Sequence, residues 1–529
     1  MKVAKLKIQI RSLLFATWTA FVLGCSLHIQ ASWAQDQRPK QKTNEQKRSS
    51  LDENSIGQRG NKRDAAIYLQ PADVAMLAKA SVILGRPTAS SITLSIVSTK
   101  SGVASVEYST TGDWSKSQKQ STTLVGGNPR ELELSGLESD KRYHYRVLLT
   151  SPGEEPVIIA EKQFQTQRSP GKGFVFELQG DSHPERPQQF DPALYAQTLR
   201  SVAADQPDFY ILMGDDFSVD TLPIVNAQTV AQRYWLQRPY LALVGQSAPL
   251  FLVNGNHEQA SAANLDGTPE NVAVWAQNSR NTIFPQPAPD AFYSGNKDLV
   301  PHIGLLRNYF AWTWGDALFV VIDPYWHTNK PVDNAFENGR NKADQKLQEA
   351  TRAWRDMWDI TLGDNQYHWL EKTLTSSNAK FKFVFAHHVL GTGRGGVEQA
   401  GFFEWGGRDR RGVDSFKQCR PNWSMPIHQL MVKSGVSIFF QGHDHMFAQQ
   451  ELDGVVYQTL PQPGDPNYAT HYETAYRSGV SLPSSGRVRV TVTPEKLHVE
   501  YVRSFLPSDE PASQGGSSAA YSYVLTAKK

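Results

Sequence analysis

The chain has 529 residues, which is too long for one ordinary domain and predicts two or three domains with sizeable cores. Its 54 lysines and arginines nearly balance its 52 aspartates and glutamates, and the formal net charge at pH 7 is +2. This balance gives no support for a nucleic-acid partner or for general binding to a membrane surface. No nucleic-acid-binding module is recognisable in the sequence.

Residues 1–34 have the pattern of a secretory signal peptide. Basic residues near the start precede the apolar run LLFATWTAFVLGC, and Ser32 and Ala34 put small residues three and one positions before Gln35. The sequence therefore predicts cleavage after Ala34 and export, which gives a secreted or periplasmic protein.

This N-terminal segment has two alternative interpretations. The run VLGC resembles a lipoprotein signal in which Cys25 is lipidated, although Leu23 is large for that motif. An uncleaved anchor is disfavoured because the apolar run is short for a bilayer span. A mature chain that begins at Gln35 has no predicted membrane span and keeps Cys419 as its single cysteine, so an intrachain disulfide is excluded.

Residues 35–79 are predicted to be a disordered tether and its lead-in. The part up to about Asp64 is charged, rich in Gln, Asn and Ser, and nearly free of large apolar side chains. Such a segment cannot bury enough apolar surface to fold.

Residues 80–166 predict a small all-β domain, because short strands joined by turns are typical of a β-sandwich. The spacing of Leu137 and Tyr143, with Tyr145 following, resembles the tyrosine corner of fibronectin type III domains. A hairpin of another small β domain is the alternative, and nothing in the sequence indicates a partner for this domain. The strand-like runs occupy residues 92–98, 103–110 and 132–150.

Residues 174–505 follow a linker-like stretch at 167–173 and have a different pattern. Apolar strands alternate with amphipathic helices, which predicts an α/β domain. Residues 506–529 are assigned to a C-terminal tail. The predicted strands are FVFELQGD, FYILMGD, LFLVNGN, ALFVVID, FKFVFAH and SIFFQGH, the predicted helices are PALYAQTLRSVAA and NQYHWLEKTLTSS, and residues 487–505 predict a closing hairpin.

Residue types that bind metals follow five of these strands. In a parallel α/β sheet the carboxyl ends of the strands meet at one rim, where ligands bind. Side chains at i and i+2 of an extended segment point the same way, so Asp181 with His183, and His443 with His445, suit shared coordination. Each group alone is weak, because Gly-Asp and Gly-Asn are ordinary turn sequences. The groups are Asp181 with His183, Asp215, Asn256 with His257, His387 with His388, and His443 with His445.

The series GDSH, GDD, GNHE, AHH and GHDH resembles the motif set of calcineurin-like metallophosphoesterases over residues 174–505. The resemblance implies a β-sandwich flanked by helices, with two metal ions at the strand ends. It also implies that Asp215 bridges the metals and that His257 is the catalytic proton donor beside the substrate. The implied ligands are Asp181, His183, Asp215 and His445 for one metal, and Asp215, Asn256, His387 and His443 for the other.

The β domain in front makes the arrangement also resemble purple acid phosphatases, which carry a fibronectin-like domain before the catalytic one. Two positions depart from their pattern. Those enzymes have a small residue where this chain has His183, and a metal-binding tyrosine where this chain has Ser218. Because the tyrosine is missing, ferric iron and a purple colour are not implied, and the chain is interpreted as a non-purple relative.

The chemistry of phosphate esters explains why these residue types are needed. An ester anion repels nucleophiles, and two divalent metals held by a bridging carboxylate neutralise its oxygens and lower the pKa of a bridging water to about 7. The mixed ligands suit Zn, Mn, Fe, Co or Ni, without choosing among them. His257 can protonate the leaving oxygen near neutral pH, and its alternative role is to support a turn. Glu258 is expected to orient its neighbours rather than react.

Two further assignments concern single side chains. Arg394, in the Gly-rich loop of residues 391–412, is nearest in sequence to the predicted rim and is the candidate for binding substrate oxygens, with an ordinary surface arginine as the alternative. Adjacent strand residues point to opposite faces, so one of His387 and His388 should face the metals. Periodicity does not choose between them, but the resemblance implies His387.

The leading interpretation is an exported, binuclear metal-dependent phosphoesterase that hydrolyses phosphate esters through a metal-bridging hydroxide, with phosphomonoesters slightly preferred. One alternative is a phosphodiesterase acting on cyclic nucleotides or phospholipid-derived diesters. Another is a surface binding protein with a remnant metal site, which the complete ligand set disfavours.

Overall fold

The computed structural model describes residues 70–328, 357–389, 393–509 and 519–527. The predicted signal peptide, the lipidation alternative at Cys25 and most of the predicted tether lie outside these ranges. Among the described residues, no helix has both the length and the apolar character needed to cross a bilayer.

The first part of the described chain is a two-sheet antiparallel β-sandwich, which confirms the predicted fibronectin-like fold. One sheet has the order β1-β2-β5 and the other the order β4-β3-β6-β7. Tyr143, at the start of β6, accepts a hydrogen bond at its hydroxyl from the backbone N–H of Glu138 at 2.9 Å, as a tyrosine corner does. The strands are β1 Ala80–Gly85, β2 Ser91–Ser98, β3 Gly102–Ser109, β4 Gln118–Leu124, β5 Arg130–Ser135, β6 Arg142–Thr150 and β7 Val157–Gln165.

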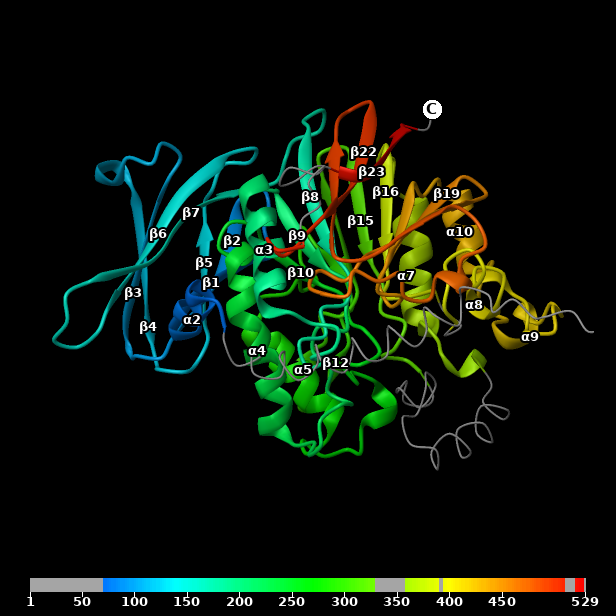
Figure 1. The fold of residues 1–529 in the computed structure, drawn as a ribbon, viewed down its shortest axis with the longest axis horizontal. Coiled ribbons are helices and arrows are strands. Elements are labelled where there is room, and N and C mark those ends of the chain that lie inside the picture. The colour runs from blue at the N-terminus through cyan, green and yellow to red at the C-terminus, as the bar shows by residue number, and fades with distance from the viewer. Residues whose placement is uncertain (1–69, 329–356, 390–392, 510–518, 528–529) are drawn as a thin grey trace, which may run out of the picture. The chain divides into compact units, whose positions relative to one another are not determined.

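Two larger mixed sheets form the second part (Figure 1). The six-stranded sheet has, in spatial order, β10 Leu250–Leu252, β9 Phe209–Leu212, β8 Phe174–Gln179, β21 Gly486–Val492, β22 Lys496–Arg503 and β23 Ala519–Thr526. The eight-stranded sheet has β11 Ser294–Gly295, β14 Phe310–Trp314, β15 Ala317–Val321, β16 Phe381–Phe385, β17 Ile438–Gln441, β19 Val455–Thr459, β18 Phe447–Leu452 and β20 Val480–Leu482. A separate small hairpin pairs β12 Leu299–Val300 with β13 Gly304–Leu305.

Helices cover the outer faces of both large sheets, which confirms the predicted sandwich flanked by helices. The core between the sheets is rich in phenylalanine, and Phe176 and Phe383 meet there with ring centroids 5.3 Å apart. Because both faces of each sheet are buried, the sequences of the central strands are continuous apolar runs. The helices are α3 Pro192–Asp205, α4 Ala227–Gly245 and α5 Val272–Ile283 beside the six-stranded sheet, and α7 Gly363–Thr375, α8 Phe403–Gly406, α9 Phe416–Cys419 and α10 Ile427–Lys433 beside the other, while α2 Ala72–Lys79 contacts α4 and β1.

Local sequence explains where the first catalytic-domain helix lies. Asp191 caps α3 by accepting hydrogen bonds from the N–H groups of Ala193 and Leu194, and Pro192 occupies the first helical position. The helix ends where Gln206 adopts a left-handed conformation. The predicted helix PALYAQTLRSVAA therefore forms as expected.

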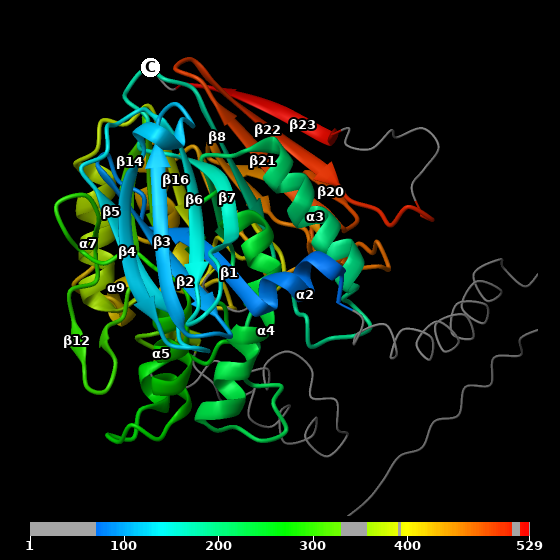
Figure 2. The same cartoon turned by 90° about the vertical axis from the view of Figure 1, so that its left-hand side faces the viewer.

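Two elements form in stretches that the sequence analysis assigned to no folded domain. Helix α2 forms in the stretch assigned to the lead-in, and it packs against α4. Strand β23 lies in the stretch assigned to the C-terminal tail, and it pairs with β22 at the edge of the six-stranded sheet (Figure 2). Both elements are short and need tertiary partners for their stability.

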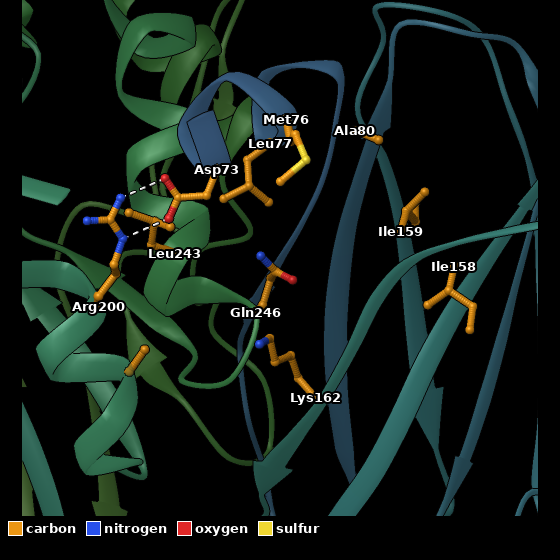
Figure 3. A pocket seen from close by; sticks show the side chains of 11 residues that line it. Asp73, Met76, Leu77, Ala80, Ile158, Ile159, Lys162, Arg200, Leu243 and Gln246 are labelled. Carbon is orange, nitrogen blue, oxygen red and sulfur yellow. Dashed lines mark hydrogen bonds and ion pairs between the residues drawn. The ribbon is translucent and has the colours of Figure 1, made fainter. Parts of the chain in front are cut away.

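Buried polar contacts join the small β-sandwich to α4. Arg238 of α4 is 1% exposed and donates hydrogen bonds to the hydroxyl of Ser81 at 3.1 Å and to the carbonyl of Ser95 at 2.8 Å. The hydroxyl of Tyr145 donates to the carbonyl of Gln246 at 2.6 Å. An open pocket of about 540 Å³ lies at this junction between α2, β7, α3 and α4 (Figure 3).

Candidate active site

The candidate residues from all five motifs lie buried around one site. The first three motifs follow β8, β9 and β10 of the six-stranded sheet, and the last two follow β16 and β17 of the eight-stranded sheet. The expected meeting of strand ends is therefore made by two facing sheets rather than by one parallel sheet. The side chains brought together are at most 4% exposed, and they are Asp181, His183, Asp215, Asn256, His257, His387, His443 and His445.

Carboxylate and imidazole atoms form three groups of potential ligands within this site, and in each group these atoms lie within 4.8 Å of one another. Two of them share no residue and are called the two groups below: Asp181 with His183 and His445, and Asp215 with His387 and His443. The third, His183 with Asp215 and His257, overlaps both. In the first group Asp181 Oδ2 is 3.0 Å from His445 Nε2 and 3.6 Å from His183 Nε2. Donor atoms around one bound transition-metal ion have comparable spacings of about 3–3.6 Å.

Asp215 connects its own group to the group of Asp181. Its Oδ2 atom is 2.9 Å from His387 Nε2, 3.9 Å from His183 Nε2 and 3.6 Å from His257 Nε2. Its Oδ1 atom accepts a hydrogen bond from the backbone N–H of His257 at 2.8 Å, which fixes the carboxylate. One carboxylate oxygen thus faces histidines of both groups.

Four of these residues have backbone conformations that side-chain-bearing residues seldom adopt. The φ angles are +43° at His183, +57° at Asp215, +70° at His443 and +55° at His445. Such conformations are typical of functional sites. They also correct the expectation from extended geometry, since His443 and His445 join different groups: the chain turns between them instead of continuing as a strand.

The glycines of the motifs allow neighbouring loops to touch. A Cβ at Gly214 would lie 2.6 Å from the backbone nitrogen of Gly255, and a Cβ at Gly255 would lie 2.2 Å from Asp215 Oδ1. No other residue fits at these contacts without moving the loops. The Gly-Asp and Gly-Asn sequences therefore bring two strand ends close together.

Glu258 connects the same two loops through hydrogen bonds from their backbone. Its buried carboxylate accepts hydrogen bonds from the backbone N–H groups of Gly255 at 2.7 Å, Asp216 at 2.9 Å and Phe217 at 3.1 Å. These contacts are those of an orienting residue, the role expected for Glu258 from the sequence.

Two of the imidazoles are oriented by hydrogen bonds at Nδ1, the ring nitrogen that faces away from the carboxylates. His387 Nδ1 lies 2.7 Å from the carbonyl of Met213, and His183 Nδ1 lies 3.0 Å from both Ser218 Oγ and Glu185 Oε1. A donor at Nδ1 leaves the Nε2 lone pair directed at the carboxylates, as in most metal-binding histidines. Ser218, at the position where the sequence analysis noted the absence of a tyrosine, thus contacts His183.

The donor set fits a binuclear metal site. Asp181 Oδ2, His183 Nε2 and Asn256 Oδ1 are buried without a hydrogen-bond partner among the described residues. Burial by itself raises the pKa of Asp181, but the nearby imidazoles of His387 and His445 have the larger effect, and the pKa of Asp181 lies well below its usual value. Burial lowers the pKa of His387, but Asp215 and Asp181 raise it to about 10. The site therefore attracts cations, and a bound metal ion would replace the proton that the raised pKa places on His387.

His388 and Arg394 lie beside the site with contacts of their own. His388 Nδ1 is 2.5 Å from the hydroxyl of Tyr325, and His388 is in neither group of potential ligands. The Arg394 guanidinium donates to the carbonyl of His443, pairs with Asp444 at 3.2 Å and stacks over the Tyr472 ring at 3.9 Å.

Two residues at the site were missed by the sequence analysis. Asp220 lies 2.8 Å from His257 Nδ1, and Arg186 Nη2 lies 2.9 Å from His257 Nε2. Asp220 is five positions after Asp215, and Arg186 is five positions after Asp181. Both follow recognised motifs, but turn geometry decides whether such residues reach the site, and spacing alone does not predict it.

The family model for calcineurin-like phosphoesterases matches residues 178–447, slightly more than half of the chain. The chain belongs to this family. The predicted class of enzyme, a metal-dependent phosphoesterase, is thereby confirmed, and the Asp/His groups fit the two-metal site expected of it. No match was found among curated proteins.

Two solved structures share the fold with this family member. The structure of PhoD is 15% identical, with a TM-score of 0.57, and the match covers 84% of this chain and 90% of that chain. The purple acid phosphatase PPD1 from yellow lupin (Lupinus luteus) seeds is 16% identical, with a TM-score of 0.52, and the match covers 84% and 74% of the two chains. At these identities the likeness shows the fold alone.

The contacts of the adjacent histidines generate a prediction. His387→Ala removes a potential ligand from the group that contains Asp215, so we expect loss of one metal ion per chain and a fall in activity of at least about 100-fold. His388→Ala removes a neighbour of Tyr325, and we expect both metals to remain, with a loss of about 10-fold or less. Metal stoichiometry of the two variants, measured by mass spectrometry, shows which histidine binds a metal. A His388 variant that lacks one metal would reverse the assignment.

Proposed function

We propose that the protein is an exported binuclear metallophosphoesterase that hydrolyses phosphate esters, with phosphomonoesters preferred over diesters. The observation that carries this proposal is the position of Asp215, whose Oδ2 atom faces His387 at 2.9 Å and His183 at 3.9 Å. A carboxylate oxygen shared by two groups of donors is the feature that sets the spacing of two metal ions.

The residues that would hold the metals are the two geometric groups, extended by Asp215 as a shared ligand and by the buried side chain of Asn256, as the resemblance implies. We assign Asp181, His183, Asp215 and His445 to one ion, and Asp215, Asn256, His387 and His443 to the other. When bound, the two ions neutralise the phosphoryl oxygens and supply a hydroxide nucleophile near neutral pH. The nitrogen and oxygen donors suit Zn, Mn, Fe, Co or Ni.

We assign the role of proton donor to the leaving group to His257. Asp220 lies 2.8 Å from its Nδ1 atom, and this contact orients the ring so that Nε2 points toward Asp215. Burial lowers the pKa of His257, but the carboxylates of Asp215 and Asp220 outweigh it and raise the pKa to about 9. An imidazole that carries a proton at neutral pH suits an acid that protonates an alkoxide.

The location and the domain limits are also proposals. Export is supported by the basic start and the apolar run of residues 1–34, with lipidation at Cys25 as the alternative. The proposed division of the chain places the fibronectin-like domain at residues 80–166 and the phosphoesterase domain at residues 174–505, with β23 added to its sheet.

Removal of the metals tests the proposed function. We expect chelation to lower the hydrolysis of p-nitrophenyl phosphate by at least about 100-fold, and expect added Zn²⁺, Mn²⁺, Fe²⁺, Co²⁺ or Ni²⁺ to restore it, because the ions supply both charge neutralisation and the nucleophile. Steady-state rates before chelation, after it and after metal addition give the answer. Full activity in protein shown to be metal-free would refute the mechanism.

The role of His257 is tested by its dependence on the leaving group. We expect His257→Ala to slow an alkyl phosphate by about 100- to 10,000-fold and p-nitrophenyl phosphate by about 10-fold or less, because only the poor leaving group needs a proton. The control is His498→Ala, which changes a partly exposed histidine on β22 and should leave both rates unchanged. Equal losses on the two esters would indicate a role in metal binding or folding instead.

A further inference from the structure

Arg186 lies at the edge of the site, directly beside the group proposed to act as acid. Its side chain is 17% exposed, whereas the metal-ligand candidates are almost completely buried. Its Nη2 atom lies 2.9 Å from His257 Nε2, and His257 Nε2 is in turn 3.6 Å from Asp215 Oδ2. The guanidinium is thus separated from the shared carboxylate by one imidazole, and it is accessible from solvent.

The backbone holds this arginine in place. The N–H of Arg186 donates to the carbonyl of His183 at 3.0 Å, so the arginine belongs to the same turn as a candidate metal ligand. Glu185 lies 3.4 Å from Arg186 Nε and also contacts His183 Nδ1. A cation anchored in this way is preorganised toward an anion at the metal site.

Arg394, the arginine expected from the sequence to bind substrate, is engaged differently. It donates to the carbonyl of His443, pairs with Asp444 at 3.2 Å and stacks over Tyr472 at 3.9 Å. These contacts hold the loop after β17 against the loop that carries Arg394. Arg186 instead lies 2.9 Å from the His257 nitrogen that the proposed reaction needs for its proton transfer, so a substrate oxygen between the two can accept hydrogen bonds from both.

We infer that Arg186 binds a terminal phosphoryl oxygen of the substrate and thereby selects phosphomonoesters over phosphodiesters. The inference rests on the proposed function. A guanidinium binds phosphate oxygens through paired N–H groups, and an anion seated between Arg186 and His257 can accept hydrogen bonds from both.

The selectivity follows from the number of oxygens and the charge. A monoester has three terminal oxygens and carries a charge close to −2 at neutral pH, whereas a diester has two terminal oxygens and a charge of −1. When bound, two metal ions would neutralise two terminal oxygens of either ester. A third terminal oxygen, free to accept from Arg186, exists in the monoester alone.

The test compares two esters with the same leaving group. For Arg186→Gln in metal-loaded protein, we expect kcat/KM to fall by about 10- to 100-fold for p-nitrophenyl phosphate and by less than about 3-fold for bis(p-nitrophenyl) phosphate. Binding measured by calorimetry should weaken by a similar 10- to 100-fold for inorganic phosphate, and should stay unchanged for dimethyl phosphate. Arg186→Lys should fall between the wild type and the Gln variant, because it keeps the charge but loses the planar fork.

The matched control is Arg146→Gln in the β-sandwich. Arg146 is 23% exposed and pairs with Glu107 at 2.6 Å, so its loss also removes a half-buried ion pair, but it should leave the ratio of the two activities unchanged. Metal stoichiometry on both variants should equal that of the wild type.

The outcomes separate this inference from the function on which it rests. Equal losses on the two esters would mean that Arg186 only positions His257, and no loss on either would mean that it has no part in binding. Both results overturn the selectivity of Arg186 while leaving the phosphoesterase intact. A wild-type protein without metal-dependent activity on either ester would instead reject the proposed function.

Discussion

The carboxylate of Asp215, buried among histidines, is the interaction on which the rest of the site depends. Burying ionisable groups so close together is costly unless each is paired or binds a metal. Here Asp215 Oδ2 and the neighbouring Asp181 Oδ2 face several imidazole nitrogens at 2.9–3.9 Å. Two metal ions would satisfy both carboxylates at once, which explains why a stable fold retains so polar a cluster at the end of an apolar core.

The surrounding fold serves to bring these atoms together from distant parts of the chain. Two sheets packed through phenylalanine side chains put five strand ends at one place. Glycines 214 and 255 allow the loops to touch, and Glu258 ties them through backbone N–H groups. The positive φ angles at four candidate ligands are the local strain that this packing sustains.

The sequence predicted the strands that precede the motifs because each is a continuous apolar run, and the resemblance carried by the motifs implied the sandwich. The candidate residues named from these motifs lie together in the structure. Extended geometry predicted shared coordination by His443 and His445, whereas the resemblance implied their division between two metals; the extended-geometry argument failed because their backbone leaves the extended conformation. The sequence analysis missed Asp220 and Arg186 because their roles depend on how two turns meet in space. Helix α2 and strand β23 also escaped prediction, because short elements are fixed by tertiary contacts rather than by their own sequence.

The proposed chemistry depends above all on two metal ions that share Asp215. Anomalous X-ray diffraction from crystals of the protein grown with Zn²⁺ or Mn²⁺ tests it most directly. We expect two anomalous peaks, about 3.5–4 Å apart, one on each side of Asp215 Oδ2, and each near the histidines of one group. A single peak, or peaks away from Asp215, would contradict the account.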